Sequence, residues 1–204
     1  MRSMQPDSGL SQQVGPAELF DREYFECGPQ SGKSLYQNYT WLPSLTIPLA
    51  MSMIDYLDIP RGASVLDIGC AKGYLVKALR WLHRQAYGYD VSRYALSHAD
   101  PEVAPYLSMT LTDETMDWAI AKDVLEHVTY DQLPGLLRSI PSTKLFIIVP
   151  LGQDGQYVVP AYEQDMTHMI REPLGWWEVQ LIEAGWDVRH STYRVSGIKD
   201  NWAQ

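Results

Sequence analysis

Short apolar runs alternate with amphipathic segments along the chain from about residue 61 onward. Runs with the length of buried strands lie at 64–68, 86–89, 107–111, 117–121 and 144–149. Helices are expected between and after them, near 73–83, 92–99, 130–139 and 174–184. This alternation predicts an α/β fold with a doubly wound, mostly parallel sheet and helices on both faces. A final strand or hairpin is expected over about 186–197.

The first 60 residues follow a different pattern. Residues 1–16 are polar and predict a flexible tail. Residues 17–60 form an extension rich in aromatic side chains, in which Pro43 is suited to the first turn of a helix. The expected organisation is therefore a tail (1–16), an aromatic cap (17–60) and a cofactor-binding domain (61–204), which together make a single domain.

The segment from Val65 to Leu75 carries the most specific chemistry. An apolar run ends in Asp67, a turn follows at Gly69, and an amphipathic segment opens at Gly73, which is typical of a Rossmann-like strand, loop and helix. Asp90 follows Gly69 by 21 residues, at the end of the second apolar run. Because a carboxylate at that point can accept hydrogen bonds from ribose hydroxyls, the pattern predicts an adenosine-containing ligand.

The glycine spacing argues against a dinucleotide. A G-x-G-x-x-G loop leaves space for a pyrophosphate, but Ala71 and Tyr74 stand where its second and third glycines would be. An NAD-dependent oxidoreductase is therefore the least favoured of the functions that this loop allows.

The form D-x-G-C-x-x-G-x-L resembles motif I of the class I S-adenosylmethionine-dependent methyltransferases. The resemblance runs from about Asp55 to Trp186, because 117–128 is similar to the family's fourth strand and its "LEH" turn, and 144–150 to its fifth strand. Ala71 departs from the glycine of many members, although alanine is also small. The resemblance implies a class I methyltransferase fold, S-adenosylmethionine as cofactor and S-adenosylhomocysteine as product.

The resemblance also implies which residues hold the cofactor. Asp90 would take the ribose, Val91 and residues near Leu111 would flank the adenine, and Lys122 and Asp123 would lie near the sulfonium. The full set of expected cofactor-binding residues is Asp67, Gly69, Cys70, Ala71, Gly73, Tyr74, Leu75, Asp90, Val91, Leu111, Thr112, Lys122 and Asp123.

His127 and His168 are the candidate catalytic residues. An imidazole can take a proton from a hydroxyl or amine while the methyl group is transferred. For His127 a structural role, packed under the sheet and hydrogen-bonded to backbone, is an equal alternative. Asp165 is placed either to orient His168 or to cap the turn that contains it.

Asp123-x-x-Glu126-His127 allows a second interpretation. It is similar to the E-x-x-E-H divalent-metal site of ubiquinone-pathway O-methyltransferases and small-RNA 3′-end methyltransferases. That likeness implies Asp123, Glu126, His127 and His168 as ligands of a metal that orients and acidifies an acceptor hydroxyl. Aspartate replaces the first glutamate here, and metal-independent members share a similar turn, so the metal is the less favoured interpretation.

Composition narrows the partners. The net charge of −9 disfavours nucleic acid as a substrate, because phosphate binding needs a basic footprint. The chain has no run of 18 apolar residues, so no membrane span is expected. A disulfide between the two cysteines, Cys27 and Cys70, is not expected, which favours a cytoplasmic setting.

Residues 28–34 resemble a P-loop but have three residues between the glycines where that motif needs four, so they are interpreted as a flexible loop that can act as a lid.

The sequence therefore predicts S-adenosylmethionine-dependent methyl transfer to oxygen or nitrogen of a small-molecule or glycan-like acceptor. The alternative is a non-catalytic protein that binds S-adenosylmethionine as a scaffold or sensor.

Overall fold

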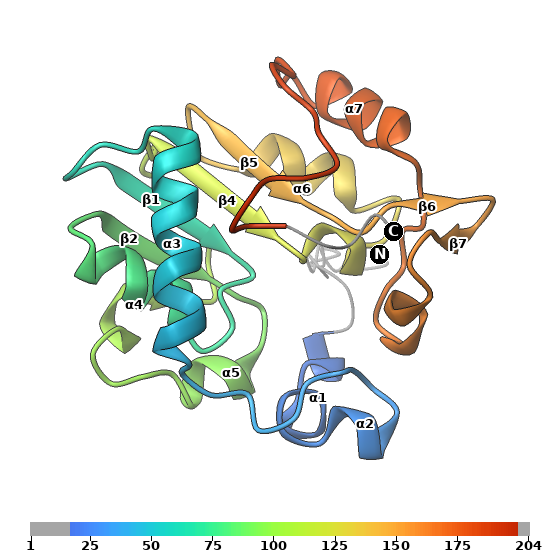
Figure 1. Cartoon of the computed structure of the whole chain (residues 1–204), viewed down its shortest axis with the longest axis horizontal. Coiled ribbons are helices and arrows are strands. Elements are labelled where there is room, and N and C mark those ends of the chain that lie inside the picture. Colours follow the sequence, from blue (N-terminus) through green and yellow to red (C-terminus); the bar gives the residue numbers. More distant parts are fainter. Residues whose placement is uncertain (1–16, 200–204) are drawn as a thin grey trace, which may run out of the picture.

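A five-stranded parallel sheet forms the centre of the molecule (Figure 1). The computed structural model describes residues 17–199. The strand order is β3-β2-β1-β4-β5. The strands are β1 (Ser64–Ile68), β2 (Gln85–Tyr89), β3 (Leu107–Ser108), β4 (Trp118–Lys122) and β5 (Leu145–Ile148). Val65 of β1 pairs with Ala86 on one side and Trp118 on the other, so β1 occupies the middle of the sheet.

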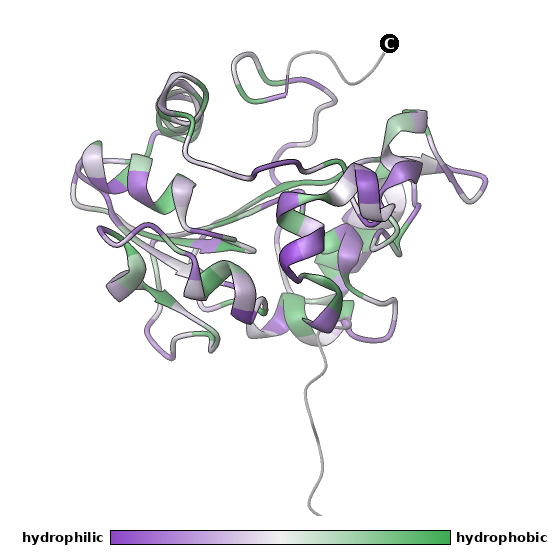
Figure 2. Ribbon diagram, turned by 90° about the horizontal axis from the view of Figure 1, so that it is seen from below, coloured by the Kyte–Doolittle hydropathy of each residue, from purple (hydrophilic) through white to green (hydrophobic). Residues whose placement is uncertain are grey.

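Helices cover both faces of this sheet because successive strand residues point in opposite directions. Val65 packs in one hydrophobic cluster with residues of α3 (Pro43–Leu57) and α4 (Tyr74–Trp81). Leu66 packs in a second cluster with residues of α6 (Leu133–Ser139) and α7 (Leu174–Glu183). Figure 2 shows the predominantly hydrophobic strands crossing the molecule and the helices around them with alternating hydrophilic and hydrophobic residues. The predicted doubly wound α/β fold is confirmed.

The remaining elements are short. The helices are η1 (Ala17–Leu19), α1 (Arg22–Glu26), α2 (Gly28–Ser31), α5 (Arg93–Ser97), η2 (Ala104–Tyr106), η3 (Leu125–His127) and η4 (Pro160–Gln164). A two-stranded antiparallel hairpin, β6 (Gly152–Gln153) and β7 (Gln156–Tyr157), follows β5. Across residues 17–199 no helix has both the length and the apolar character needed to cross a membrane.

The strand expected over 186–197 is wrong for the part of the chain that the structure describes. After α7 the chain forms only an isolated bridge between Val195 and Lys199, and β5 has no strand beyond it in the described sheet. The physical reason is composition, because 187–194 is mainly polar or charged and Tyr193 is 62% exposed. The third strand is also shorter than the expected 107–111.

Polar contacts add to the apolar packing of α3 in attaching the aromatic cap to the rest of the domain. The Lys72 ammonium, which follows β1, pairs with Glu26 at 2.6 Å and donates a hydrogen bond to the Tyr39 carbonyl oxygen at 2.8 Å. The segment that resembles a P-loop contains α2, and its Lys33 pairs with Asp21 and Glu23. The tail expected over 1–16 lies outside the described residues.

Candidate active site

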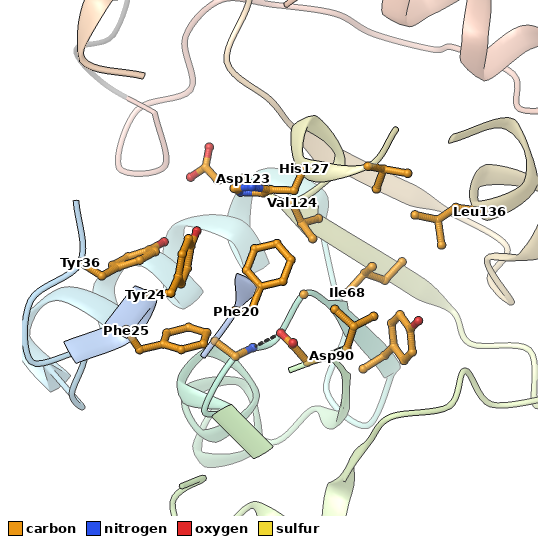
Figure 3. Close-up of a pocket in the computed structure, with 15 residues that line it drawn as sticks. Phe20, Tyr24, Phe25, Tyr36, Ile68, Asp90, Asp123, Val124, His127 and Leu136 are labelled. Atoms are coloured by element: carbon orange, nitrogen blue, oxygen red, sulfur yellow. Dashed lines mark hydrogen bonds between the residues drawn. The ribbon is translucent and has the colours of Figure 1, made fainter. Parts of the chain in front are cut away.

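A pocket opens at the carboxyl ends of β1, β2 and β4, where the strand order reverses on either side of β1. Ligands of open α/β sheets bind at such a switch point. Motif I, the ends of the neighbouring strands and the aromatic cap all contribute to its walls (Figure 3). The lining residues are Phe20, Tyr24, Phe25, Tyr36, Ile68, Gly69, Ala71, Tyr89, Asp90, Val91, Asp123, Val124, His127, Val128 and Leu136.

The loop after β1 needs glycine at its first position. Gly69 has φ of 73°, and a Cβ there would lie 2.3 Å from Cγ2 of Val124. Ala71 also adopts a left-handed conformation, with φ of 49°. This conformation explains why glycine suits that position, and alanine holds it here at some cost in strain.

Asp90 joins this loop to the end of β2. Its side chain accepts hydrogen bonds from the backbone amides of Ala71 and Ser92, both at 2.7 Å. Burial raises the pKa of Asp90, and the bonds from Ser92 and Ala71 oppose that rise. Each carboxylate oxygen has a second lone pair, so the group can still accept bonds from a ribose.

Asp67 lies beneath the loop, in β1, and does not line the pocket. Burial, together with the negative charge of Asp90, raises its pKa to about 8, although Lys122 opposes the rise. Asp67 is therefore mostly protonated near neutral pH in the absence of a further cation.

Asp123 stands directly after β4 with φ of 51°, a strained conformation of the kind found at functional sites. Its carboxylate accepts bonds from Lys122 and, at 3.0 Å, from Lys199, whose ammonium also donates to the Tyr162 hydroxyl at 2.8 Å. Burial alone would raise the pKa of Asp123, but these two ammonium groups hold it below the usual range. The sequence did not indicate Lys199, because no motif links the end of the chain to β4.

His127, in η3, is oriented by a chain of hydrogen bonds. Its Nδ1 lies 2.7 Å from Oγ1 of Thr167, whose hydroxyl donates to Asp165 at 2.5 Å. The Tyr24 hydroxyl donates to the other Asp165 oxygen at 3.1 Å. Because the Thr167 proton is committed to Asp165, His127 donates through Nδ1 and keeps a lone pair on Nε2. Burial and the neighbouring His168 lower the pKa of His127 to about 4.

His168 is brought to the same place from a distant part of the chain. The Glu126 carbonyl oxygen accepts hydrogen bonds from the amides of Met169 and Ile170, which fixes this segment against η3. Nδ1 of His168 donates to the Tyr162 carbonyl oxygen at 2.8 Å, so its Nε2 also keeps a lone pair. Of the two roles expected for Asp165, the structure shows the turn cap, because its side chain accepts a hydrogen bond from the Thr167 amide at 2.9 Å. The same carboxylate also orients His127 through the Thr167 hydroxyl.

Glu126 completes a cluster that fits a metal ion. Its carboxylate is fully buried, and neither oxygen has a hydrogen-bond partner among residues 17–199. Oε1 lies 3.9 Å from Nε2 of His168, and the ligand atoms of Glu126, His127 and His168 lie within 4.8 Å of one another. Burial and the charge of Asp123 raise the pKa of Glu126 well above its usual range. A buried, unpartnered carboxylate beside two imidazoles with free Nε2 lone pairs is the donor set that a divalent transition metal requires.

The structure brings only some of the predicted residues into the pocket. Predicted residues in its lining are Gly69, Ala71, Asp90, Val91, Asp123 and His127. Predicted residues outside the lining are Asp67, Cys70, Gly73, Tyr74, Leu75, Leu111, Thr112, Lys122 and His168. Tyr74 stacks on Tyr39 of the cap instead, and Leu75 and Cys70 pack in the core.

The sequence did not identify the aromatic part of the wall as a site. Phe20, Tyr24, Phe25 and Tyr36 line the pocket although they come before the cofactor domain in the chain. The only available signal was the density of aromatic residues in 17–60, which does not indicate which rings face a ligand.

Comparisons with known proteins agree with this geometry. A family model described as a methyltransferase domain matches residues 47–196, which is more than half of the 204 residues. None of the curated proteins compared with the chain matches it.

Three solved structures illustrate the likeness of fold. A SAM-dependent methyltransferase from Archaeoglobus fulgidus superposes with a TM-score of 0.55 at 16% identity, over 70% of this chain and 71% of that one. The YcgJ protein from Bacillus subtilis superposes with a TM-score of 0.50 at 13% identity, over 67% of each chain. CalO1, a methyltransferase in calicheamicin biosynthesis with SAH bound, superposes with a TM-score of 0.50 at 16% identity, over 70% of this chain and 47% of that one. The chain therefore belongs to the methyltransferase domain family.

Proposed function

We propose that this methyltransferase transfers the methyl group of S-adenosylmethionine to an oxygen or nitrogen atom of a small or sugar-like acceptor. The observation that carries the proposal is the position of His127. It lines the pocket together with motif I and Asp90, and its hydrogen bond to Thr167 directs the free Nε2 lone pair away from Asp165.

In this reaction the sulfur–methyl bond breaks while a new bond forms between the methyl carbon and the acceptor atom. The sulfur keeps the electron pair and becomes a neutral thioether, and the acceptor loses a proton. His127 would receive that proton on Nε2. His168, whose ring centroid lies 4.6 Å from that of His127, would support His127 from outside the pocket lining. Motif I and Asp90 would orient the cofactor for in-line attack.

The same cluster supports a metal in this site. In a metal-bound form of the site, which is an alternative to proton transfer to His127, Glu126, His127 and His168 would hold a divalent cation, because Glu126 has no other partner in the described structure. His127 would then use Nε2 as a ligand and would not act as the base. Asp123, the fourth ligand in the sequence-based hypothesis, is the weaker candidate because its oxygens bond Lys122 and Lys199. When bound, such a cation would lower the pKa of an acceptor hydroxyl that contacts it.

Turnover of tritium-labelled S-adenosylmethionine with a panel of sugars, phenols and amines tests the function. We expect label transfer to at least one hydroxyl or amine compound, and a loss of that transfer in a variant with both His127→Ala and His168→Ala. A protein that binds the cofactor but labels no member of the panel would instead support the scaffold interpretation.

Thermal unfolding in EDTA or with added Mn²⁺, Zn²⁺ or Mg²⁺ tests the metal separately. We expect at least one ion to raise the unfolding temperature of the wild-type protein and to leave Glu126→Gln unchanged. His190→Ala, an exposed histidine elsewhere, is the matched control and should keep the shift. No shift with any ion would remove the metal from the proposal.

A further inference from the structure

The rings on the cap side of the pocket have no role in the chemistry described above, in which only the Tyr24 hydroxyl takes part through Asp165. Phe20 precedes α1, Tyr24 and Phe25 belong to it, and Tyr36 follows α2. All four side chains line the pocket on the side of the cap, facing motif I and Asp123 (Figure 3). We call these four residues the aromatic box.

The rings of the box form a corner rather than a flat stack. Phe20 and Tyr24 have centroids 5.1 Å apart at 81°, and Tyr24 and Phe25 have the same separation at 79°. Tyr36 lies 5.6 Å from Tyr24 at 60°. Because these rings stand at large angles to one another, the cap side of the cavity is lined by aromatic rings in several orientations and not by one flat stack.

The charges around this cavity have one sign. Among its lining residues, all within 17–199, the carboxylates are Asp90 and Asp123, and none is Lys or Arg. The ammonium groups of Lys122 and Lys199 reach Asp123 from outside the lining. Aromatic faces attract cations through their quadrupole, and they do so more strongly when water is excluded.

We propose that the aromatic box recognises the positive charge of the sulfonium, so that the pocket binds S-adenosylmethionine more tightly than the neutral S-adenosylhomocysteine. The inference rests on the proposed function. Methyl transfer turns the sulfonium into a neutral thioether, so this attraction disappears with the product. The box therefore favours exchange of product for fresh cofactor as well as selection of the charged form.

Calorimetric titration with the two compounds measures this preference as a ratio of dissociation constants. In Phe25→Leu and Tyr36→Leu, which keep apolar bulk but remove a π face, we expect the preference for the charged compound to fall about 3- to 30-fold. Tyr36→Phe keeps the ring and should keep the wild-type ratio. Sinefungin carries an ammonium group in place of the methyl sulfonium. Its dissociation constant should therefore change in each variant by the same factor as that of S-adenosylmethionine.

Tyr39→Leu is the matched control. Tyr39 contacts both Phe25 and Tyr36 but does not line the pocket, so its loss should affect both compounds equally. An unchanged ratio in Phe25→Leu and Tyr36→Leu, with cofactor still bound, would overturn the aromatic box alone. A wild-type protein that binds neither compound would overturn the proposed function, and the inference with it.

Discussion

Two neighbouring regions differ in how a buried carboxylate is satisfied. One is the motif I loop with Asp90, where we propose that the cofactor binds (the cofactor side), and the other is the cluster of Glu126, His127 and His168, which we propose serves the acceptor (the acceptor side). Asp90 is 8% exposed and has backbone amides on both oxygens. Glu126 is 0% exposed and has no hydrogen-bond partner in the described part of the chain. Burial of a polar group without a hydrogen-bond partner costs free energy. The carboxylate on the cofactor side has its partners without a ligand, whereas the carboxylate on the acceptor side lacks them.

Local backbone geometry explains the difference. Asp90 is short and stands two residues before Ser92, so a turn of the chain provides donors directly. The Glu126 carboxylate lies within 4.8 Å of a ring nitrogen of His127 and of His168, whose Nδ1–H groups are committed to Thr167 and Tyr162. The difference teaches that a buried carboxylate is preorganised here where backbone amides donate hydrogen bonds to it. Where they do not, a bound ligand must provide the hydrogen-bond donor or the cation.

Removal of Asp90 should disrupt the cofactor side most strongly. Asp90→Ala leaves the amides of Ala71 and Ser92 unpaired and removes the acceptor for the ribose. We expect the affinity for S-adenosylmethionine to fall by at least about 100-fold, as measured by calorimetry. Asp131→Ala, on the surface, is the control, and equal affinities of the two variants would contradict the role of Asp90.

Substitution of Gly88 tests whether close packing between β2 and the motif I loop stabilises the cofactor side. A Cβ at Gly88, in β2, would lie 2.6 Å from Sγ of Cys70, inside the motif I loop. Gly88→Ala should lower the free energy of unfolding by about 1–3 kcal/mol in urea titrations. Gly135→Ala in α6 meets no atom within 4 Å and should raise it by up to about 1 kcal/mol. Equal effects of both changes would refute the packing argument.

The acceptor side should respond in the opposite direction when its carboxylate is removed. Glu126→Met keeps the volume but deletes a buried group without a partner, so in EDTA we expect the free energy of unfolding to rise by about 1–2 kcal/mol. Glu114→Met, at an exposed position, should change it by less than about 0.5 kcal/mol. A clear loss of stability in Glu126→Met would show that the carboxylate has a structural partner.

The pH dependence of cofactor affinity through Asp67 is the smallest effect on binding that we expect. Its pKa is raised from 3.8 to about 8 on folding, so its contribution to stability is full below pH 3.8, falls as the pH rises to about 8, and is constant above that. If the positively charged cofactor favours the ionised form, its affinity should rise up to about tenfold between pH 7 and pH 9, with proton release. Calorimetry in two buffers of different ionisation enthalpy measures that release, and Asp67→Asn should abolish it.

The sequence predicted the parts of the site that local patterns encode. The strand, loop and acidic residue from Val65 to Asp90 lie close together in the chain. Their spacing predicted that Gly69 and Asp90 meet, the resemblance to motif I added Ala71, and all three line the pocket. The position of His127 also followed from its place directly after β4. Fold class and sheet direction were predictable for the same reason, since strands and helices alternate along the sequence.

The rest depends on contacts between distant residues, which spacing cannot encode. Tyr24 and Asp165 are separated by 141 residues, and His127 and Thr167 by 40. No periodicity shows which rings of an aromatic segment face a cavity, so the aromatic box was not predictable. The strand expected over about 186–197 was wrong because a few alternating apolar residues do not determine whether a segment pairs with a neighbouring strand.

The bond between Lys199 and Asp123 joins the last described residue to the centre of the site. Free-energy coupling between two such positions is reciprocal. We expect a ligand that changes the charge near Asp123 to change the stability of the Lys199 contact, and that contact to change the affinity for the ligand by the same free energy. Protease sensitivity around 187–199, compared between the free, cofactor-bound and product-bound protein, measures this coupling without an acceptor.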